Sequence, residues 1–342
     1  MRAAEAVRHG RAGLSRRRFL QFSALLAAGV FCRRASGDPG GLDAWTSHGY
    51  DLRQTRHNPR EARIGPATVA DLALAWEFEA GSGITSTPAI VGDRVVFGSW
   101  DGNVYALSLR SGKLLWKCTV GTRHYPPDRE LGVYASAALS RSTVYVACDR
   151  LVAISLDDGK VRWERTIGAP EKTLEYFWAS PIVDRGRLYA GVSAGSETRT
   201  RGRIVCLDAG SGEVLWTFFT VAEDVAGGAL VAAPSLDVRT GTLWTASGNP
   251  FHLRPGPLRH SVSLLALDAA SGKLLWADQV HPRDDKNLDL NCPPVLLTVH
   301  GAGKPLRLVV TGGKDGLRAW DRDTKRRFWH VQLTPVIPEK ET

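Results

Sequence analysis

The chain has 342 residues, 43% of them hydrophobic, and a formal net charge of +9. A chain of this length and composition can bury a large core, as either one large domain or two. Residues 1–37 contain eight arginines against one glutamate and carry +7 of the charge, which leaves about +2 for the rest. The basic balance is therefore no sign of a nucleic-acid-binding surface, and no basic stretch interleaved with aromatic residues points to one.

Residues 1–37 resemble a cleavable export signal. The paired arginines Arg16 and Arg17 are followed by Phe19-Leu20, an apolar run over 22–31 and the small residues at 35–37. The run is too short to span a bilayer. Paired arginines before Phe-Leu resemble a twin-arginine signal, which exports folded proteins, and the alternative is a disordered basic arm. We therefore expect a soluble mature protein, periplasmic or secreted, with no membrane span.

The cysteines do not form a cofactor-binding motif. They stand at Cys32, Cys118, Cys148, Cys206 and Cys292, and none has a Cys-x-x-Cys or Cys-x-x-Cys-His spacing. Covalent haem and a zinc ribbon are therefore excluded. The four mature cysteines could pair in three ways in an oxidising compartment, and the sequence does not choose among these pairings. We expect buried single thiols.

One phrase of about eleven residues, a strand, a turn and a strand ending in tryptophan, occurs five times. Its copies span 106–116, 153–163, 206–216, 266–276 and 319–329, and their tryptophans fall 47, 53, 60 and 53 residues apart. The fifth copy has lost the glycine that the other four carry in the turn. Each copy is typical of a β-hairpin, in which an Asp or Ser side chain opens the turn and the glycine takes a positive φ.

Another pair of short strands precedes each hairpin, as at 86–90 and 94–98 before the first. Four strands per period predict an all-β fold, a β-propeller of four-stranded blades with about five blades recognisable. A single blade cannot bury both of its faces, so blades must stack, and we expect the repeated tryptophans to pack between them. The predicted order is an N-terminal segment over 38–75, blades over 76–330 and a tail over 331–342.

Trp76 predicts a lone outer strand without a blade of its own, which would complete a sheet closed from the other end of the chain. The residues after the fifth hairpin are too few for another blade. Either the chain is a truncated relative or fragment of a larger ring, or a smaller ring closes. We favour truncation.

The hairpin phrase resembles the tryptophan-docking motif of quinoproteins, eight-bladed propellers that bind pyrroloquinoline quinone on their axis. Residues 45–59 resemble the amino-terminal signature of that family. Residues 83–89 and 97–103 are most similar to its polyvinyl-alcohol dehydrogenase branch. The resemblance covers roughly residues 43–330.

The resemblance implies a set of site residues. Glu197 matches the calcium-binding glutamate of the family, and Asn249 in Gly-Asn-Pro matches a second calcium ligand. Asp289 resembles the aspartate that is taken as the general base of the family and that also contacts the calcium ion. Lys314 matches the residue that hydrogen-bonds the quinone oxygens. Oxygen ligands suit a hard divalent cation, and the four residues occur in the order of the family.

The resemblance implies that the protein oxidises an alcohol with pyrroloquinoline quinone as cofactor. The alcohol could be polymeric, as polyvinyl alcohol is. Calcium would polarise the quinone carbonyl, Asp289 would remove the alcohol proton and Lys314 would stabilise charge on the quinone oxygens. Since this chain has no haem motif, the electrons would pass to an external acceptor such as a cytochrome c.

Two positions depart from the family pattern. Val231, in the segment 227–234, stands where many members have a tryptophan under the quinone, and valine has no stacking face. Residues 135–138, Ala-Ser-Ala-Ala, stand near the place of an adjacent-cysteine pair that covers the quinone in alcohol-oxidising relatives.

A non-catalytic propeller that binds another protein of the cell envelope is the main alternative. A hydrolase is disfavoured, because the chain has no Gly-x-Ser-x-Gly elbow and no His-Glu-x-x-His helix.

Overall fold

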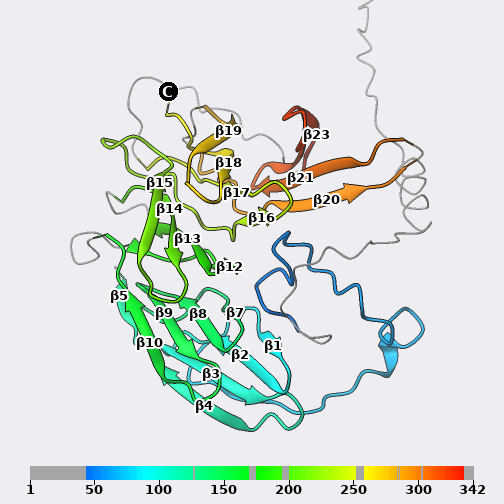
Figure 1. Ribbon diagram of the computed structural model, residues 1–342, viewed down its shortest axis with the longest axis vertical. Coiled ribbons are helices and arrows are strands. Elements are labelled where there is room, and N and C mark those ends of the chain that lie inside the picture. The colour runs from blue at the N-terminus through cyan, green and yellow to red at the C-terminus, as the bar shows by residue number, and fades with distance from the viewer. Residues whose placement is uncertain are drawn as a thin grey trace, which may run out of the picture. The chain divides into compact units, whose positions relative to one another are not determined.

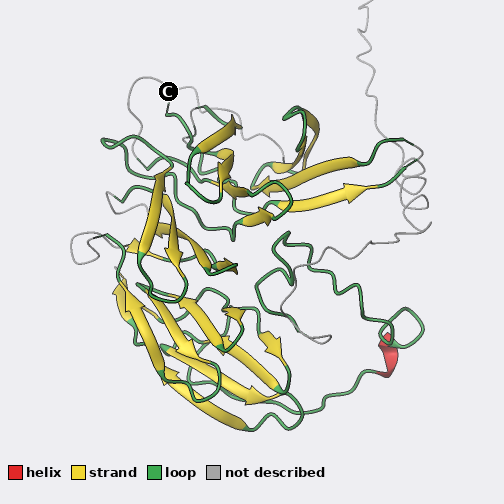
Figure 2. Cartoon of the chain, in the orientation of Figure 1, coloured by secondary structure: helices red, strands yellow, loops and turns green. Residues whose placement is uncertain are grey.

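The computed structural model describes residues 44–125, 128–168, 175–194, 200–251, 258–282, 284, 286–301 and 303–334. Within them the chain is built of β-strands, with a single turn of 3-10 helix, η1, at Val69–Asp71 (Figures 1 and 2). All blades belong to one compact unit, residues 39–299 and 305–342. The loop His300–Lys304 is not part of this unit.

The strands form five antiparallel sheets, which are the five predicted blades (Figure 1). The blades are, in order, β1 Ala89–Val91, β2 Arg94–Gly98, β3 Asn103–Ser108 and β4 Leu114–Thr119; β7 Ala138–Ser140, β8 Thr143–Ala147, β9 Leu151–Ser155 and β10 Val161–Arg165; β12 Ile182–Asp184, β13 Arg187–Ala194, β14 Arg203–Asp208 and β15 Val214–Phe219, with β11 Glu175–Tyr176 beside β13; β16 Ser235–Asp237, β17 Thr242–Ala246, β18 Ser263–Asp268 and β19 Leu274–Gln279; β20 Val295–Val299, β21 Leu306–Gly313, β22 Gly316–Asp321 and β23 Arg327–Gln332. A small two-stranded sheet, β5 Arg123–Tyr125 with β6 Arg129–Leu131, lies between the first two blades in sequence.

The repeated phrase forms the outer hairpin of each blade, as predicted. In the third copy Asp208 Oδ1 accepts hydrogen bonds from the backbone N–H groups of Gly210 and Ser211, at 3.0 and 2.8 Å. Gly212 then takes a φ of +72°, in the left-handed region. A register shift follows, because Cys206 faces Trp216 whereas the next residue, Leu207, faces Val214. The turn chemistry of the sequence is therefore sufficient to build this hairpin.

The tryptophan of each outer strand joins its blade to the next one. At four seams the indole ring lies against the hairpin glycine of the following blade, and its Nε1 donates to the carbonyl three residues before that glycine. The four bonds are Trp76 to Leu109 O (2.9 Å), Trp116 to Leu156 O (2.9 Å), Trp163 to Ala209 O (3.1 Å) and Trp216 to Ala269 O (3.2 Å). The expectation that the repeated tryptophans pack between blades is confirmed for Trp116, Trp163 and Trp216.

Trp76 corrects one expectation. The residues around it form no strand and belong to none of the described sheets. The indole docks on Gly112 of the first blade instead, as the other docking tryptophans do on theirs. The docking contact therefore forms here without a strand, because it needs only the ring and the glycine turn.

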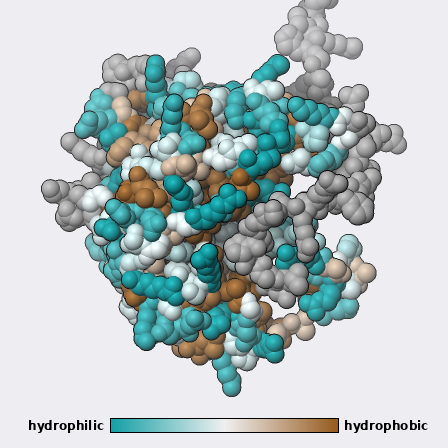
Figure 3. All heavy atoms as spheres, in the orientation of Figure 1, coloured by the Kyte–Doolittle hydropathy of each residue, from teal (hydrophilic) through white to brown (hydrophobic). Residues whose placement is uncertain are grey.

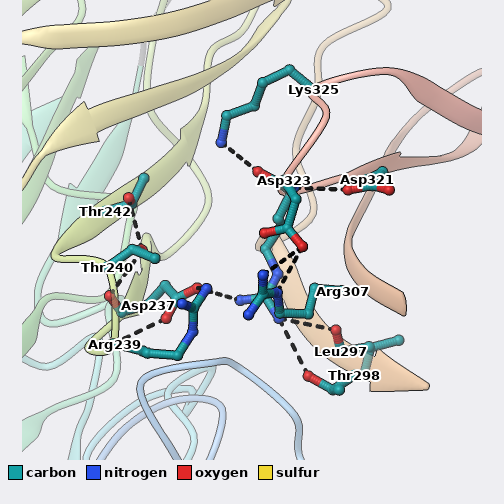
Figure 4. Close-up of polar contacts among 11 residues, drawn as sticks. Asp237, Arg239, Thr240, Thr242, Leu297, Thr298, Arg307, Asp321, Asp323 and Lys325 are labelled. Carbon is teal, nitrogen blue, oxygen red and sulfur yellow. Dashed lines mark hydrogen bonds and ion pairs between the residues drawn. The ribbon is translucent and has the colours of Figure 1, made fainter. Parts of the chain in front are cut away.

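The seam between the fourth and fifth blades is built differently (Figure 4). Lys325 occupies the glycine position with a φ of +63°, and its Nζ donates to Arg322 O at 2.6 Å. Among the described residues no bond joins the indole of Trp276 to that carbonyl. The buried Arg322 pairs with Asp237 of the fourth blade at 2.6 Å, and Arg327 of the fifth blade pairs with Asp278 of the fourth at 2.5 Å. Ion pairs thus replace the tryptophan contact at this seam.

The core lies between blades rather than at one centre. Separate clusters of buried side chains join consecutive blades, with fully buried members such as Val96 and Val144, Leu151 and Leu188, Ile204 and Leu243, and Trp244 and Val309. The outer strands expose apolar side chains, among them Leu114, Val214, Leu275 and Phe328. On the face drawn in Figure 3 the apolar surface is divided into patches between hydrophilic residues.

A segment ahead of the blades, residues 45–53, bonds to the first strand of four of them. The backbone bonds are Ile90 N to Trp45 O (2.7 Å), Leu139 N to Thr46 O (2.8 Å), Leu236 N to Leu52 O (2.7 Å) and Leu296 N to Arg53 O (2.9 Å). The first strands would otherwise be open sheet edges, and the segment satisfies part of their backbone. Residues 45–53, which we call the inner segment, therefore lie where these blades converge.

The four described cysteines are free thiols, as expected, and three of them are buried. Cys292 is the exposed one. Burial, with the neighbouring carboxylate of Asp149, raises the pKa of Cys148 to about 12, so this thiol stays protonated at neutral pH. In the part of the chain that the structure describes, no helix has the length and hydropathy needed to cross a membrane.

The docking contact predicts how much stability is lost when a methyl group is added at the hairpin glycine. An alanine Cβ at residue 159 would lie 2.8 Å from the Trp116 ring, whereas one at residue 186 would meet nothing within 4 Å. Both glycines have similar left-handed φ values, +73° and +78°. We expect Gly186→Ala to lower the unfolding free energy by about 1 kcal/mol from backbone strain alone, and Gly159→Ala to lower it by roughly 1–3 kcal/mol more. Urea denaturation of both variants measures the difference, and equal losses would contradict the proposed role of the contact.

Candidate active site

Three of the four side chains expected in the site lie together. Asp289 Oδ1 accepts a hydrogen bond from the backbone N–H of Asn249 at 2.7 Å, and its Oδ2 accepts one from Lys314 Nζ at 3.0 Å. Asn249 follows β17 in the fourth blade, Asp289 precedes β20, and Lys314 lies in the turn between β21 and β22 of the fifth. Two neighbouring blades therefore hold one carboxylate between a backbone donor and an ammonium group.

Two glycines allow this close approach. A Cβ on Gly248 would lie 2.4 Å from Asp289 Oδ1, and one on Gly313 would lie 2.3 Å from the Asp289 carbonyl oxygen. Leu290 and Gly313 form an isolated antiparallel bridge, which fixes the Asp289 segment against the end of β21. Side chains at either glycine would push this segment away, so the glycines of the motifs Gly-Asn-Pro and Gly-Gly-Lys supply room for Asp289.

Glu197, the fourth expected residue, lies outside the described residues. Ser193 and Arg201, on either side of it, are held on the 227–230 loop, Ser193 by a hydrogen bond to Leu230 O and Arg201 by a bridge to Gly227. Among the described residues no group of three His, Cys, Asp or Glu side chains is arranged to hold a metal ion. Asn249 Oδ1 accepts no hydrogen bond there, and its amide nitrogen donates to Pro250 O at 3.2 Å.

A cavity of about 230 Å³ lies beside these residues. Every blade and the N-terminal region contribute to its wall: His48 and Arg56 from the latter, and Thr85, Ser136, Ser180, Val231 and Asn291 from the five blades in order. Val231 and Ser136 were singled out from the sequence as neighbours of a quinone, and the fold brings them into one cavity.

The cavity and the Asp289 cluster are joined by two short stretches of chain. Gly248 N donates to Ala229 O at 2.8 Å, two residues before Val231 in the cavity wall. Asp289 is likewise two residues before Asn291, another lining residue. Asp289 itself is not part of the lining, so the carboxylate flanks the cavity rather than facing into it.

Two aromatic residues in the wall were not predicted as site residues. Tyr134 and Trp178 both line the cavity, with their ring centroids 4.8 Å apart in an edge-to-face arrangement. Trp178 belongs to no copy of the hairpin phrase, and this was the available signal that it does something other than dock a blade. Val231 supplies no stacking face, but the cavity is not without aromatic surface.

The residues contributed by the N-terminal region carry the charge of the cavity. Arg56 Nη2 lies 3.2 Å from His48 Nε2, and Gln54 Oε1 lies 3.3 Å from the other ring nitrogen. Burial and the positive charge of Arg56 lower the pKa of His48 below its usual value, against the opposing effect of Gln54. His48 is therefore a neutral imidazole at neutral pH, and Arg56 is the charged member of the pair.

A second polar cluster adjoins Lys314 in sequence. Asp315 pairs with Arg318, whose Nη1 lies 2.9 Å from Oδ1, and with His281, whose Nε2 lies 3.0 Å from Oδ2. Burial alone would raise the pKa of Asp315, but the hydrogen bonds and charges of Arg318 and His281 outweigh it and hold the pKa at about 2. The turn that carries Lys314 is anchored by these pairs.

Two family models match the chain. One, described as outer membrane protein assembly factor BamB, matches residues 68–248. The other, described as glucose/ethanol/alcohol dehydrogenase, beta-propeller domain, matches residues 232–341.

Curated relatives and a solved structure agree with these matches. A quinohemoprotein alcohol dehydrogenase of Comamonas testosteroni is 28% identical over 324 residues, covering 80% of this chain and 44% of the relative. A polyvinylalcohol dehydrogenase of a Pseudomonas species is 27% identical over 282 residues, covering 73% and 42%. The crystal structure of the Comamonas enzyme has a TM-score of 0.73 at 24% identity, covering 85% of this chain and 49% of that one. The chain thus spans less than half the length of these two curated relatives.

The site geometry predicts unequal roles for the two partners of Asp289. Lys314 is 42% exposed, so Lys314→Met should lower the unfolding free energy by less than about 1 kcal/mol. Asp289→Ala leaves the N–H of Asn249 without its acceptor and should cost about 1–3 kcal/mol. Denaturant unfolding of the two variants measures both values. A larger loss from Lys314→Met would show that the ion pair, not the backbone bond, anchors the carboxylate.

The depressed pKa of Asp315 predicts a pH dependence. A carboxyl group with a folded pKa of about 2 and a usual value of 3.8 stabilises the fold fully above pH 4 and loses this contribution as pH falls toward 2. The contribution is about 2 kcal/mol. The stability gap between the parent protein and Asp315→Asn should therefore narrow as the pH falls from about 4 toward 2. Unfolding measured at pH 6, 4 and 2.5 tests this, and a constant gap would be contrary to it.

Proposed function

The chain belongs to the family of quinoprotein, PQQ-dependent alcohol dehydrogenase-like β-propellers, and from this premise we propose that it oxidises an alcohol with pyrroloquinoline quinone and calcium as cofactors. Polymeric alcohols such as polyvinyl alcohol are among the candidate substrates, because a polyvinylalcohol dehydrogenase is among the relatives. The observation that carries the proposal is the convergence of Asn249, Asp289 and Lys314 beside the cavity.

Asp289 is the proposed general base. Its carboxylate is held by the N–H of Asn249 on one oxygen and by Lys314 on the other, and its side chain is 17% exposed. A carboxylate held in this way is already oriented, so it can accept the hydroxyl proton of an alcohol without a further conformational change. Lys314, on a turn anchored through Asp315, would donate to an oxygen that gains negative charge during the reaction.

The described residues fit the two cofactors in chemical type. Asn249 Oδ1 and the Asp289 carboxylate are hard oxygen donors of the kind that calcium prefers, and Glu197 would add a second carboxylate. The aromatic rings and hydroxyl groups of the cavity wall suit a planar, oxygen-rich ligand. When bound, calcium would act as a Lewis acid and the quinone would accept the two electrons that the alcohol loses.

The cavity volume sets a condition on binding. At about 230 Å³ the cavity is smaller than the roughly 300–1,000 Å³ of common ligand sites. Lining side chains must therefore move outward when a tricyclic ligand enters. Arg56 is exposed and can move at little cost, whereas the innermost backbone of the blades is pinned by its hydrogen bonds.

The proposal includes the location of the protein and the fate of the electrons. The leader over 1–37, with its paired arginines, supports export to the periplasm through a twin-arginine-type signal. An external acceptor such as a cytochrome c would take the electrons.

A non-catalytic scaffold of the cell envelope is the second candidate. It is favoured by the family model described as outer membrane protein assembly factor BamB, which matches residues 68–248. It is also favoured by Val231 in the cavity wall, since valine offers a bound quinone no stacking face. In this function the site residues would only hold neighbouring blades together, and a partner protein would bind another surface.

Reconstitution distinguishes the two functions. We expect the protein incubated with pyrroloquinoline quinone and calcium to retain quinone absorbance after gel filtration and to oxidise an alcohol in a dye-coupled assay. Asp289→Asn keeps an acceptor for the N–H of Asn249 but removes the base, so it should lower kcat by about 10²–10⁴ while quinone is retained.

Asp157→Asn is the matched control, because this aspartate is 70% exposed and pairs with Arg94 away from the cavity. It should leave kcat unchanged. Failure of the parent protein to retain quinone or to oxidise any alcohol would reject the dehydrogenase and leave the scaffold. In that case Glu197→Ala should leave partner binding unchanged.

A further inference from the structure

We propose that Arg56 is the anion-binding residue of the central cavity and receives a carboxylate group of an aromatic ligand there. The inference rests on the proposed function in taking pyrroloquinoline quinone, a planar aromatic polycarboxylate, as that ligand. The resemblance assigned a quinone contact to Lys314 alone. Arg56 comes from the region ahead of the blades, which no part of the repeat pattern marks as a site.

The first argument is charge. Among the described residues that line the cavity, Arg56 is the one that is formally charged, and the others are neutral polar, aromatic and apolar side chains. In the described part of the chain Arg56 has no carboxylate partner, and the nearest group is the imidazole of His48 at 3.2 Å. Since that imidazole is neutral, the positive charge of the cavity is not compensated.

The second argument is backbone geometry. Gln54 and Arg56 both have left-handed φ values, +59° and +53°, which are uncommon for residues other than glycine. The conformation is held by a bond from Arg56 N to Gly49 O at 2.9 Å and by one from the buried Gln54 Nε2 to Pro234 O at 3.1 Å. Pro234 directly follows the lining residues 231–233. The strained turn therefore fixes the place of the Arg56 backbone relative to the cavity wall.

The third argument is the chemistry of the other lining residues. Tyr134 and Trp178 offer aromatic surface, while Ser136 and Ser180 offer hydroxyl groups. A guanidinium group matches a carboxylate with two parallel hydrogen bonds, and aromatic rings bind a planar ligand by stacking or by edge contacts. Together these groups select an aromatic acid over a neutral or cationic ligand.

Ligand binding to the full chain with calcium tests the proposal. Quenching of tryptophan fluorescence gives the Kd for pyrroloquinoline quinone and for its uncharged trimethyl ester. Arg56→Gln should raise the Kd of the acid by about tenfold or more and leave that of the ester unchanged. Arg53→Gln is the matched control, because Arg53 lies in the same stretch, is 49% exposed and already pairs with Asp51. It should change neither Kd, and circular dichroism should show that both variants are folded.

The outcomes separate this inference from the proposed function. If the quinone binds the parent protein and Arg56→Gln equally well, Arg56 is not the anion-binding residue, although the dehydrogenase proposal stands. If the quinone does not bind, pyridine-2,4-dicarboxylate serves as the probe. Binding of this probe that is lost in Arg56→Gln supports the anion site and rejects the quinone, and absence of binding rejects both.

Discussion

A tryptophan ring lying on a glycine turn is the contact on which the blades depend. The glycine must have a left-handed backbone to close its own hairpin, and it must lack a side chain to admit the ring of the preceding blade. One residue thus meets a local and a tertiary requirement at once. The fifth seam shows what happens without it. Lys325 keeps the left-handed turn, but its side chain takes the carbonyl that an indole would use, and ion pairs around Arg322 join the blades instead.

The hydrophobic clusters that lie between blades also include residues of the loops at the blade ends, such as Leu230 and Leu290, and these contacts fix the loops on the sheets. Such loops can carry chemistry while the sheets hold them in place. The Asp289 cluster and the central cavity are both built from these loops. The inner segment adds a constraint, since it bonds to the first strands of four blades and leads directly to Arg56. The wall of the cavity therefore combines repeated elements with a region that is outside the repeat.

Order along the chain was enough to select Asn249, Asp289 and Lys314 for one site, although up to 65 residues separate them. Asn249 and Lys314 each follow the second strand of a blade, whereas Asp289 precedes the first strand of the fifth blade, and the fourth and fifth blades bring these three positions together. Val231 and the stretch 135–138 were also selected from the resemblance, and Val231, Ala135 and Ser136 line the cavity. Arg56 was missed because it lies ahead of the repeat. Trp178 was missed although, like Tyr134 and Val231, it lies four residues before the first strand of its blade.

By itself the sequence determined the strands, the hairpin turns, the number of recognisable blades and the residues that join them. These features depend on contacts within one period, where the turn residues and the alternation of apolar side chains act directly on the backbone. Only the tertiary structure decided that Trp76 docks without forming a strand, that the inner segment runs along the first strands of four blades and that Arg56 faces the cavity. These outcomes depend on how the blades stack and on backbone bonds between segments more than a hundred residues apart, and no local pattern encodes such distances.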